Sequence, residues 1–159
     1  QKTALLAPYA TGILPNYCRG GGKLFISGSY IGNKLGDTNF TANVLKYTYG
    51  GSMKHVRSGE IFGTNIRFQI PRGANEQTYA VPAPDCILPA EQAFPVFCYT
   101  EGKQCAGVAY KGRYRTFVLG FPFESIVNAD QRTHVMKAML HFLRRNNALY
   151  SFNFLSLLM

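Results

Sequence analysis

The chain has 159 residues and is 47% hydrophobic, enough for one substantial core and too little to expect two, so we expect a single domain over residues 1–159. No apolar run approaches the roughly 18 residues of a membrane-spanning helix. Lysine and arginine total 17 against 8 acidic residues, a formal charge of +9, but these cations are scattered, which favours a solvated basic face over a dedicated polyanion site.

The first half of the chain predicts a short helix, a strand and a longer helix. ILPNYCRGGG reads as a short helix ended by glycines, and Lys23–Ser27 as a buried strand. IGNKLGDTNF is rich in Gly, Asn and Asp, which predicts a loop, and FTANVLKYTYG predicts a helix from near Asn39 to Gly50.

The middle of the chain predicts an antiparallel meander. Between Ser58 and Ala83, GEIFG, NIRFQI and TYAVPA are short alternating runs broken by Gly73 and prolines. QAFPVFCYT, CAGVAYKG and YRTFVLGF predict three further strands with hairpin turns at EGKQ and KGR.

An amphipathic helix closes the pattern. Asn128 or Asp130 is its expected cap, and Asn128 with Gln131 has capping-box spacing. One face is apolar and the other polar, which predicts packing against a sheet. The apolar residues are Val135, Met136, Met139, Leu140 and Leu143, and the polar ones are Arg132, Lys137, His141 and Arg144. The apolar segment after Asn147 is expected to pack on the domain.

The cysteines and histidines form no recognisable metal pattern. Cys18, Cys86, Cys98 and Cys105 contain no CxxC pair, and we expect buried free thiols, with a Cys98 to Cys105 bridge across a hairpin as the alternative. His55, His134 and His141 show no HExxH pattern and read as surface residues. We therefore expect no metal site and no cofactor.

Two apolar runs end in turns that carry polar side chains, where an α/β domain usually keeps its site. GGKLFISGSYIG presents Ser29, the best-placed nucleophile, although GxSxG spacing is absent. FVLGFPFESI presents Glu124, which either stabilises the following helix N-terminus or faces a ligand together with Ser29. The candidate ligand-binding residues are Ser29, Tyr30, Glu124 and Ser125.

Four segments carry a family resemblance. GGKLFISGSYIG, DCILPA, GRYRTFVLGFPFESI and QRTHVMKAMLHFL resemble the C-terminal domain of bacterial xanthan lyase-like proteins, over residues 20–143. That domain is similar to class I glutamine amidotransferases. The resemblance implies an α/β fold with a three-layer, flavodoxin-like sheet, here with an antiparallel β meander in the middle and a C-terminal amphipathic helix.

The same resemblance argues against catalysis. Amidotransferases place a cysteine nucleophile after a central strand and a histidine in a pattern like FHPE. Here Ser29 stands at the first position and, in FPFE, Pro122 stands at the second, so only Glu124 remains. A proline accepts no proton, and loss of one triad member costs orders of magnitude in rate.

Three functions therefore stay open. The first is a noncatalytic accessory or interaction module of a larger, secreted bacterial protein, associated with polysaccharide and located in the periplasm or outside the cell. Its partners would be other domains of the parent protein or an acidic polysaccharide, rather than nucleic acid. The second is a serine hydrolase or transferase that uses Ser29, and the third is a polyanion-binding module that uses the +9 charge.

Overall fold

A mixed six-stranded sheet with the order β1-β8-β7-β6-β3-β4 is the largest element of the structure. The computed structural model describes residues 9–35, 39–54, 56–62, 66–71 and 80–144. Within this sheet β1 and β8 run parallel, and every other neighbouring pair is antiparallel. The six strands are β1 (Lys23–Ser27), β3 (Ser58–Ile61), β4 (Arg67–Gln69), β6 (Ala93–Tyr99), β7 (Cys105–Lys111) and β8 (Arg115–Leu119).

A second, two-stranded antiparallel sheet and several helices complete the described part. The small sheet pairs β2 (Tyr47–Ser52) with β5 (Asp85–Pro89). The helices are the π-helical segments η1 (Tyr9–Ile13) and η2 (Phe40–Leu45), α1 (Leu14–Arg19), α2 (Ile31–Lys34), the 3-10 turn η3 (Phe123–Ser125) and α3 (Ala129–Arg144).

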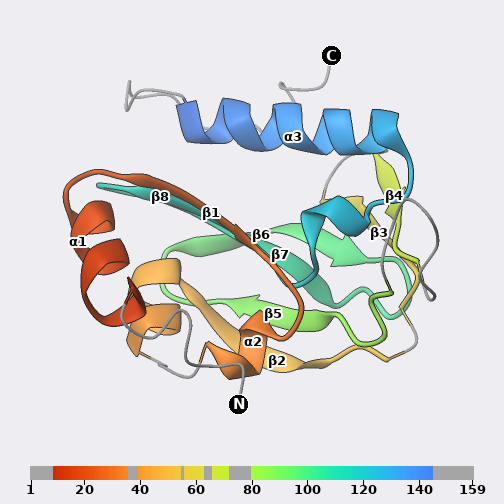
Figure 1. The fold of residues 1–159 in the computed structure, drawn as a ribbon, viewed down its shortest axis with the longest axis horizontal. Helices are drawn as coiled ribbons and strands as arrows, with labels where there is room; N and C mark the ends of the chain where they lie inside the picture. The colour runs from red at the N-terminus through yellow and green to blue at the C-terminus, as the bar shows by residue number, and fades with distance from the viewer. Residues whose placement is uncertain (1–8, 36–38, 55, 63–65, 72–79, 145–159) are drawn as a thin grey trace.

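Hydrophobic cores lie on both faces of the six-stranded sheet. Helix α3 covers one face of the curled sheet, and α1, α2 and the β2-β5 pair lie on the other side (Figure 1). The first core joins α3 to aromatic residues of the sheet such as Phe97 and Phe117. The second joins Cys18, Phe40 and Ile87 to Val108 and Val118. Burial of apolar side chains on both faces is the main source of stability in this arrangement.

The paired strands β1 and β8 form where the sequence predicts them. Lys23–Ser27 is a strand, and its residues pair in register with Arg115–Leu119 from Lys23↔Arg115 to Ser27↔Leu119. The hairpins β6-β7 and β7-β8 also confirm the prediction for the three strands between residues 92 and 121. Near the first of these turns Gly102 has φ +77°, a conformation that glycine adopts without strain.

Helix α3 has the predicted N-cap, but its buried face differs from the predicted apolar face. The Asn128 side chain accepts a hydrogen bond from the Gln131 N–H at 2.9 Å, as an N-cap should. Leu140, expected in the core, is 37% exposed, and Phe142 is buried in its place. The buried face consists of Val135, Ala138, Met139, Phe142 and Leu143.

Arg115 is an exception to the expectation that the cations form a solvated basic face. Arg115 is 3% exposed, its guanidinium donates to the Phe142 carbonyl, and it lies 5.6 Å from the centre of the Phe142 ring. A cation at the carbonyl end of α3 suits the helix dipole. The side chain therefore ties the end of α3 to β8 and contributes nothing to the basic surface.

The prediction for residues 39–50 is wrong beyond Leu45. The π-helical segment ends at Leu45, the next residue Lys46 is left-handed with φ 67°, and the chain continues as β2. Tyr47 is fully buried and its hydroxyl donates to the Ile31 carbonyl at 2.8 Å. Pairing with β5 therefore overrides the local helical pattern, as tertiary contacts commonly do.

Three other expectations need correction. IGNKLGDTNF is not all loop, because its start forms the single turn of α2. TYAVPA yields no strand over its described residues 80–83, where Pro82 lacks a backbone donor. DCILP, for which no strand was predicted, is β5. His55, residues 78–79 and the segment after Asn147 lie outside the described residues.

The fold is a mixed α/β arrangement with a curled, mostly antiparallel sheet and a C-terminal helix. A flavodoxin-like sheet is built from parallel strands, and only the β1-β8 pair among the described strands is parallel, so the three-layer flavodoxin-like arrangement is not confirmed. None of the described helices is long and apolar enough to span a membrane.

Candidate functional site at the ends of β1 and β8

The two turns singled out in the sequence lie side by side. Parallel pairing brings Ser27 opposite Leu119, so both strands release their chains at the same edge. The Phe123 N–H of the second turn donates to the Ser27 hydroxyl of the first at 3.3 Å. The expected juxtaposition is therefore present, and Ser27, which the sequence did not single out, makes the direct link between the turns.

The first turn carries Ser29 and Tyr30. Ser29 is half-buried, and none of the described residues hydrogen-bonds to its hydroxyl. Tyr30 is left-handed with φ 62° and 40% exposed, and α2 starts at the next residue. A non-glycine residue with positive φ is uncommon, and here it bends the chain sharply from β1 into α2.

The second turn carries Pro122, Glu124 and Ser125. Ser125 is buried and its hydroxyl donates to the Pro122 carbonyl at 2.6 Å, so it closes the turn and does not face a ligand. Glu124 is exposed. The N-cap of α3 is Asn128, and Glu124 lies in the 3-10 turn that precedes it. Of the four candidate ligand-binding residues, Ser29, Tyr30 and Glu124 reach the surface.

Asp85, at the start of β5, joins both turns. Its backbone N–H donates to the Gly120 carbonyl at the end of β8 at 2.7 Å. Its Oδ2 accepts the Gly32 N–H of α2 at 2.8 Å, across 53 residues of sequence. Asp85 is fully buried. The carboxyl therefore lies beneath the turns and anchors α2.

The environment of Asp85 favours its neutral form. Oδ1 is buried and has no hydrogen-bond partner among the described residues. Burial raises the pKa of this carboxyl above its ordinary value, which the hydrogen bond from Gly32 partly offsets. Burial likewise raises the pKa of the Tyr47 and Tyr99 hydroxyls, and a charged Asp85 would raise both further. No cation among the described residues pairs with Asp85.

No base among the described residues hydrogen-bonds to the Ser29 hydroxyl. Within the described ranges, His134 directs its Nδ1 to the Asp130 carbonyl of its own helix at 2.8 Å, and His141 is exposed on α3. A serine needs a nearby general base to become nucleophilic. Asp85 serves neither as a base nor as a ligand, because it is enclosed by protein and already accepts from Gly32.

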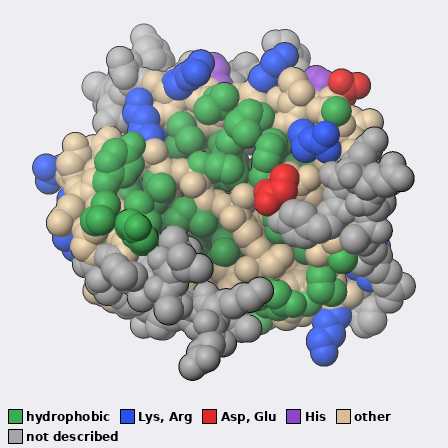
Figure 2. Space-filling model, viewed as in Figure 1, with side chains coloured by type: hydrophobic (Ala, Val, Ile, Leu, Met, Phe, Trp, Pro, Cys, Tyr) green, Lys and Arg blue, Asp and Glu red, His purple; other side chains and the backbone are tan. Residues whose placement is uncertain are grey.

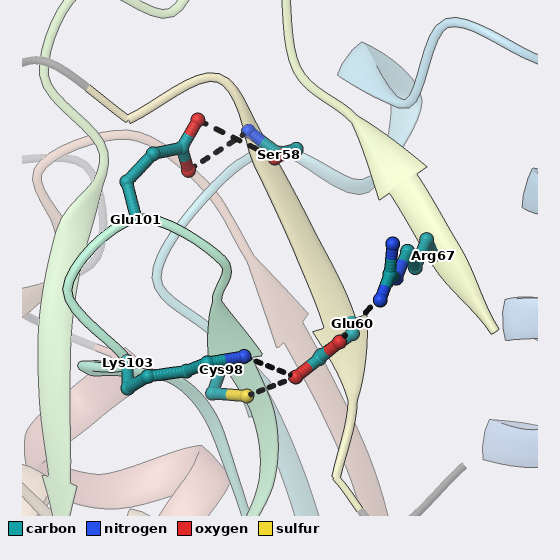
Figure 3. Close-up of polar contacts among 6 residues, drawn as sticks. All are labelled: Ser58, Glu60, Arg67, Cys98, Glu101 and Lys103. Atoms are coloured by element: carbon teal, nitrogen blue, oxygen red, sulfur yellow. Dashed lines mark hydrogen bonds and ion pairs between the residues drawn. The ribbon is translucent and has the colours of Figure 1, made fainter. Parts of the chain in front are cut away.

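A second polar cluster lies on β3 and the β6-β7 hairpin (Figure 3). Glu60 accepts from the Lys103 ammonium at 2.7 Å and lies 3.6 Å from the Arg67 guanidinium. The hydrogen bond from Lys103 is the main cause that lowers the pKa of Glu60. Nearby, the Glu101 carboxylate accepts from the Ser58 N–H at 3.3 Å. Each carboxylate is satisfied within the fold, so the cluster ties strands together.

The four cysteines are free, and three of them are buried, as expected. Cys98 and Cys105 are directly opposed in the β6-β7 pairing, yet they form no bridge. The Cys98 thiol lies 3.7 Å from Glu60. Burial raises the pKa of Cys98, and raises that of Cys105 to about 12. Nucleophilic cysteines need a lowered pKa, so these thiols are structural.

Sequence reasoning missed Asp85 altogether. An acidic residue that opens an apolar run, as in PDCILP, is the available signal, because aspartate is seldom fully buried without a specific role. Its partners, Gly32 and Gly120, are distant in sequence and become visible only in the fold.

No protein-family model and no curated protein matches the chain. Solved structures do resemble it. The mmIFT52 N-terminal domain is 12% identical with a TM-score of 0.57, and the match covers 87% of this chain and 72% of that one. The cytoplasmic protein STM3548 from Salmonella typhimurium is 16% identical with a TM-score of 0.51, over 82% of this chain and 58% of that one.

A third similar structure is the exo-beta-1,4-mannosidase Op5Man5 from Opitutaceae bacterium strain TAV5. It is 10% identical with a TM-score of 0.50, and the match covers 81% of this chain but 21% of that chain. The chain thus spans about a fifth of the mannosidase. At these identities the three likenesses concern the fold alone. None of the three is named as a xanthan lyase or an amidotransferase.

Proposed function

We propose that the chain is a noncatalytic accessory or interaction module of a larger secreted bacterial protein. The observation that carries this proposal is the set of side chains at the ends of β1 and β8. No base among the described residues hydrogen-bonds to Ser29, and the two turns bond to each other through Ser27 and Phe123. Pro122 stands where the family resemblance would place the base. Such a site keeps the position of a catalytic turn without the groups that catalysis requires.

The proposal includes a distant relation to the xanthan lyase-like C-terminal domain and the amidotransferase-like, flavodoxin-like fold. Two features support that relation. β1 and β8 are parallel neighbours whose turns meet at one edge, and the sheet has a hydrophobic core on each face. On this reading the antiparallel strands β6, β7 and β3 replace part of a parallel sheet.

A polysaccharide-associated role outside the cytoplasm is part of the same proposal. Support comes from the mannosidase, in which a similarly folded portion makes up about a fifth of an enzyme that acts on a carbohydrate. The partners we propose are other domains of the parent protein or an acidic polysaccharide, with a periplasmic or extracellular location.

The absence of catalysis is tested by a fluorophosphonate probe, which labels activated serines. We expect no labelling of the wild type at pH 7 and the same result for Ser29→Ala, because an unassisted hydroxyl stays protonated. An active serine hydrolase in the same reaction serves as the positive control. Labelling that disappears in Ser29→Ala would establish the alternative function, a serine hydrolase or transferase.

A specific observation favours polyanion binding as a second candidate. Helix α3 lines a surface hollow with two cationic side chains, Lys137 and Arg144, together with His141 and Leu140. A chain of charge +9 attracts polyanions over long range, and the hollow concentrates that charge.

Binding to an acidic polysaccharide tests this second candidate. We expect the double reversal of Lys137→Glu and Arg144→Glu to weaken binding at low salt about tenfold or more, because each change replaces attraction by repulsion. The matched control reverses two exposed cations elsewhere, Lys54→Glu and Arg113→Glu. Equal losses in both variants would indicate nonspecific attraction, and the candidate would then be wrong.

A further inference from the structure

We infer that the outer edge of β1 is a docking site for an extended segment of a partner polypeptide, which adds a strand to the sheet. The segment has apolar side chains on both faces and acidic residues at the end beside Lys23. This inference rests on the proposed interaction function and deepens it by naming the surface and the kind of partner.

The outer edge of β1 has no strand beside it among the described residues. Among the described strands only β8 pairs with β1, which lies at the end of the sheet. The Tyr17 hydroxyl accepts from the Lys23 N–H at 3.1 Å and donates to the Lys23 carbonyl at 3.2 Å, so these backbone groups point away from β8. Alternate residues of a strand point the same way. The N–H and C=O groups of Phe25 and Ser27 therefore face the open edge.

Side chains of β1 leave both hydrophobic cores incomplete at this edge. Leu24 and Ile26 are half-buried against one core and Phe25 against the other. Figure 2 shows hydrophobic side chains gathered in the middle of the face where Figure 1 places β1, with Lys and Arg mainly around the rim. An added strand with apolar residues on both faces would extend both cores.

The opposite edge of the sheet shows how an edge is protected. β4 has three residues, and Arg67 and Gln69 are exposed along it. The Gln69 carbonyl also accepts the Val127 N–H at 3.1 Å. Short length and charged or polar side chains are common protections against edge pairing. Between Leu24 and Ser27, β1 has no charged residue, no proline and no bulge.

Charge at the start of β1 selects the partner. Arg19, Lys23 and Arg113 are exposed. Gly21 lies between Arg19 and Lys23, and a Cβ on it would be 3.7 Å from the Arg113 carbonyl oxygen. The three cations therefore lie on adjoining stretches of chain. Acidic residues at the corresponding end of the added strand complement them. A second copy of the chain would bring another +9 charge, which disfavours self-association.

Two synthetic peptides test the inference, Asp-Glu-Val-Thr-Val-Ile-Val and the same residues in reverse order. They place the acidic end beside Lys23 in parallel and antiparallel pairing, respectively. We expect one of them to bind the whole chain and to slow hydrogen exchange at the Phe25 and Ser27 amides. Methylating the peptide's ladder N–H groups should abolish binding, because strand addition depends on main-chain hydrogen bonds.

Charge reversal supplies the specific control. Lys23→Glu should lower the affinity for the acidic peptide about threefold, as expected for the loss of an exposed ion pair. The same variant should raise the affinity for a peptide in which Asp-Glu is replaced by Lys-Lys. Gln69→Glu, on the opposite edge, should change neither affinity. The inference is overturned if neither peptide binds at millimolar concentration, if protection appears along β4, or if light scattering shows a dimer whose β1 amides are already protected. Such failures leave the fluorophosphonate result unaffected, whereas labelling of Ser29 would contradict the proposed function without removing the docking edge.

Discussion

Gly120→Ala is expected to destabilise the fold by more than about 4 kcal/mol, enough to abolish soluble expression of a marginally stable domain. A Cβ at this position would lie 2.2 Å from the Asp85 carbonyl oxygen and 3.1 Å from its carbon. Both are backbone atoms, so no side-chain rotation relieves the clash. The end of β8 and the start of β5 must separate, which breaks the 2.7 Å hydrogen bond from the Asp85 N–H to the Gly120 carbonyl.

Thermal unfolding of the two glycine variants measures this effect. Gly12→Ala is the matched control, because nothing lies within 4 Å of the added carbon. We expect the control to melt within a few degrees of the wild type and Gly120→Ala to melt more than about 10 °C lower, or not to fold. Similar melting temperatures for wild type and Gly120→Ala would show that β5 does not approach β8 so closely.

Elements bounded by strong local signals were predictable from the sequence. Lys23–Ser27 lies between glycine-rich segments, and the strand proved to have the predicted bounds. The Asn128 cap was predictable because its hydrogen bond joins residues three apart on one helix. Such contacts depend on local chain geometry, which the sequence states directly.

Elements that depend on distant partners were not predictable in this way. Tyr47 begins a strand because β5 pairs with it, although the preceding residues are helical. Arg115 is buried because the Phe142 carbonyl and ring receive it. In both cases a contact made across the fold decides the outcome, and neither hydrophobic period nor propensity contains it.

The candidate site was likewise predictable only in part. The position of Ser29 and Glu124 on neighbouring turns followed from two strands and a family resemblance, and parallel pairing of β1 and β8 agrees with it. The buried carboxyl beneath those turns did not follow, because charged residues are usually assigned to the surface. Asp85 was passed over for that reason, although it touches both turns.

Asp85 is expected to make the stability of the wild type fall as the pH rises. Burial raises the pKa of this carboxyl in the folded state above the value of about 3.9 in the unfolded chain. The unfolded state therefore releases its proton first. The contribution of Asp85 to stability is fully present below the unfolded pKa and is lost as the pH rises through the folded pKa.

Asp85→Asn isolates this effect. The amide oxygen keeps the acceptor for the Gly32 N–H, and the side chain no longer ionises. We expect the free energy of unfolding of the wild type, relative to Asp85→Asn, to decline steadily above about pH 4, measured by urea denaturation across a pH series. Glu91→Gln, at an exposed turn between β5 and β6, is the control and should leave the pH profile unchanged.

Asp85→Ala separates the hydrogen bond from the charge. Removal of the carboxyl leaves the Gly32 N–H without its acceptor, which we expect to cost about 1–3 kcal/mol at every pH. At low pH the wild type should therefore be the more stable of the two, and the difference should shrink or reverse as Asp85 ionises. If instead the wild type gains stability over Asp85→Asn with rising pH, the carboxylate must have a cationic partner, and the role of Asp85 as a neutral anchor for α2 would be wrong.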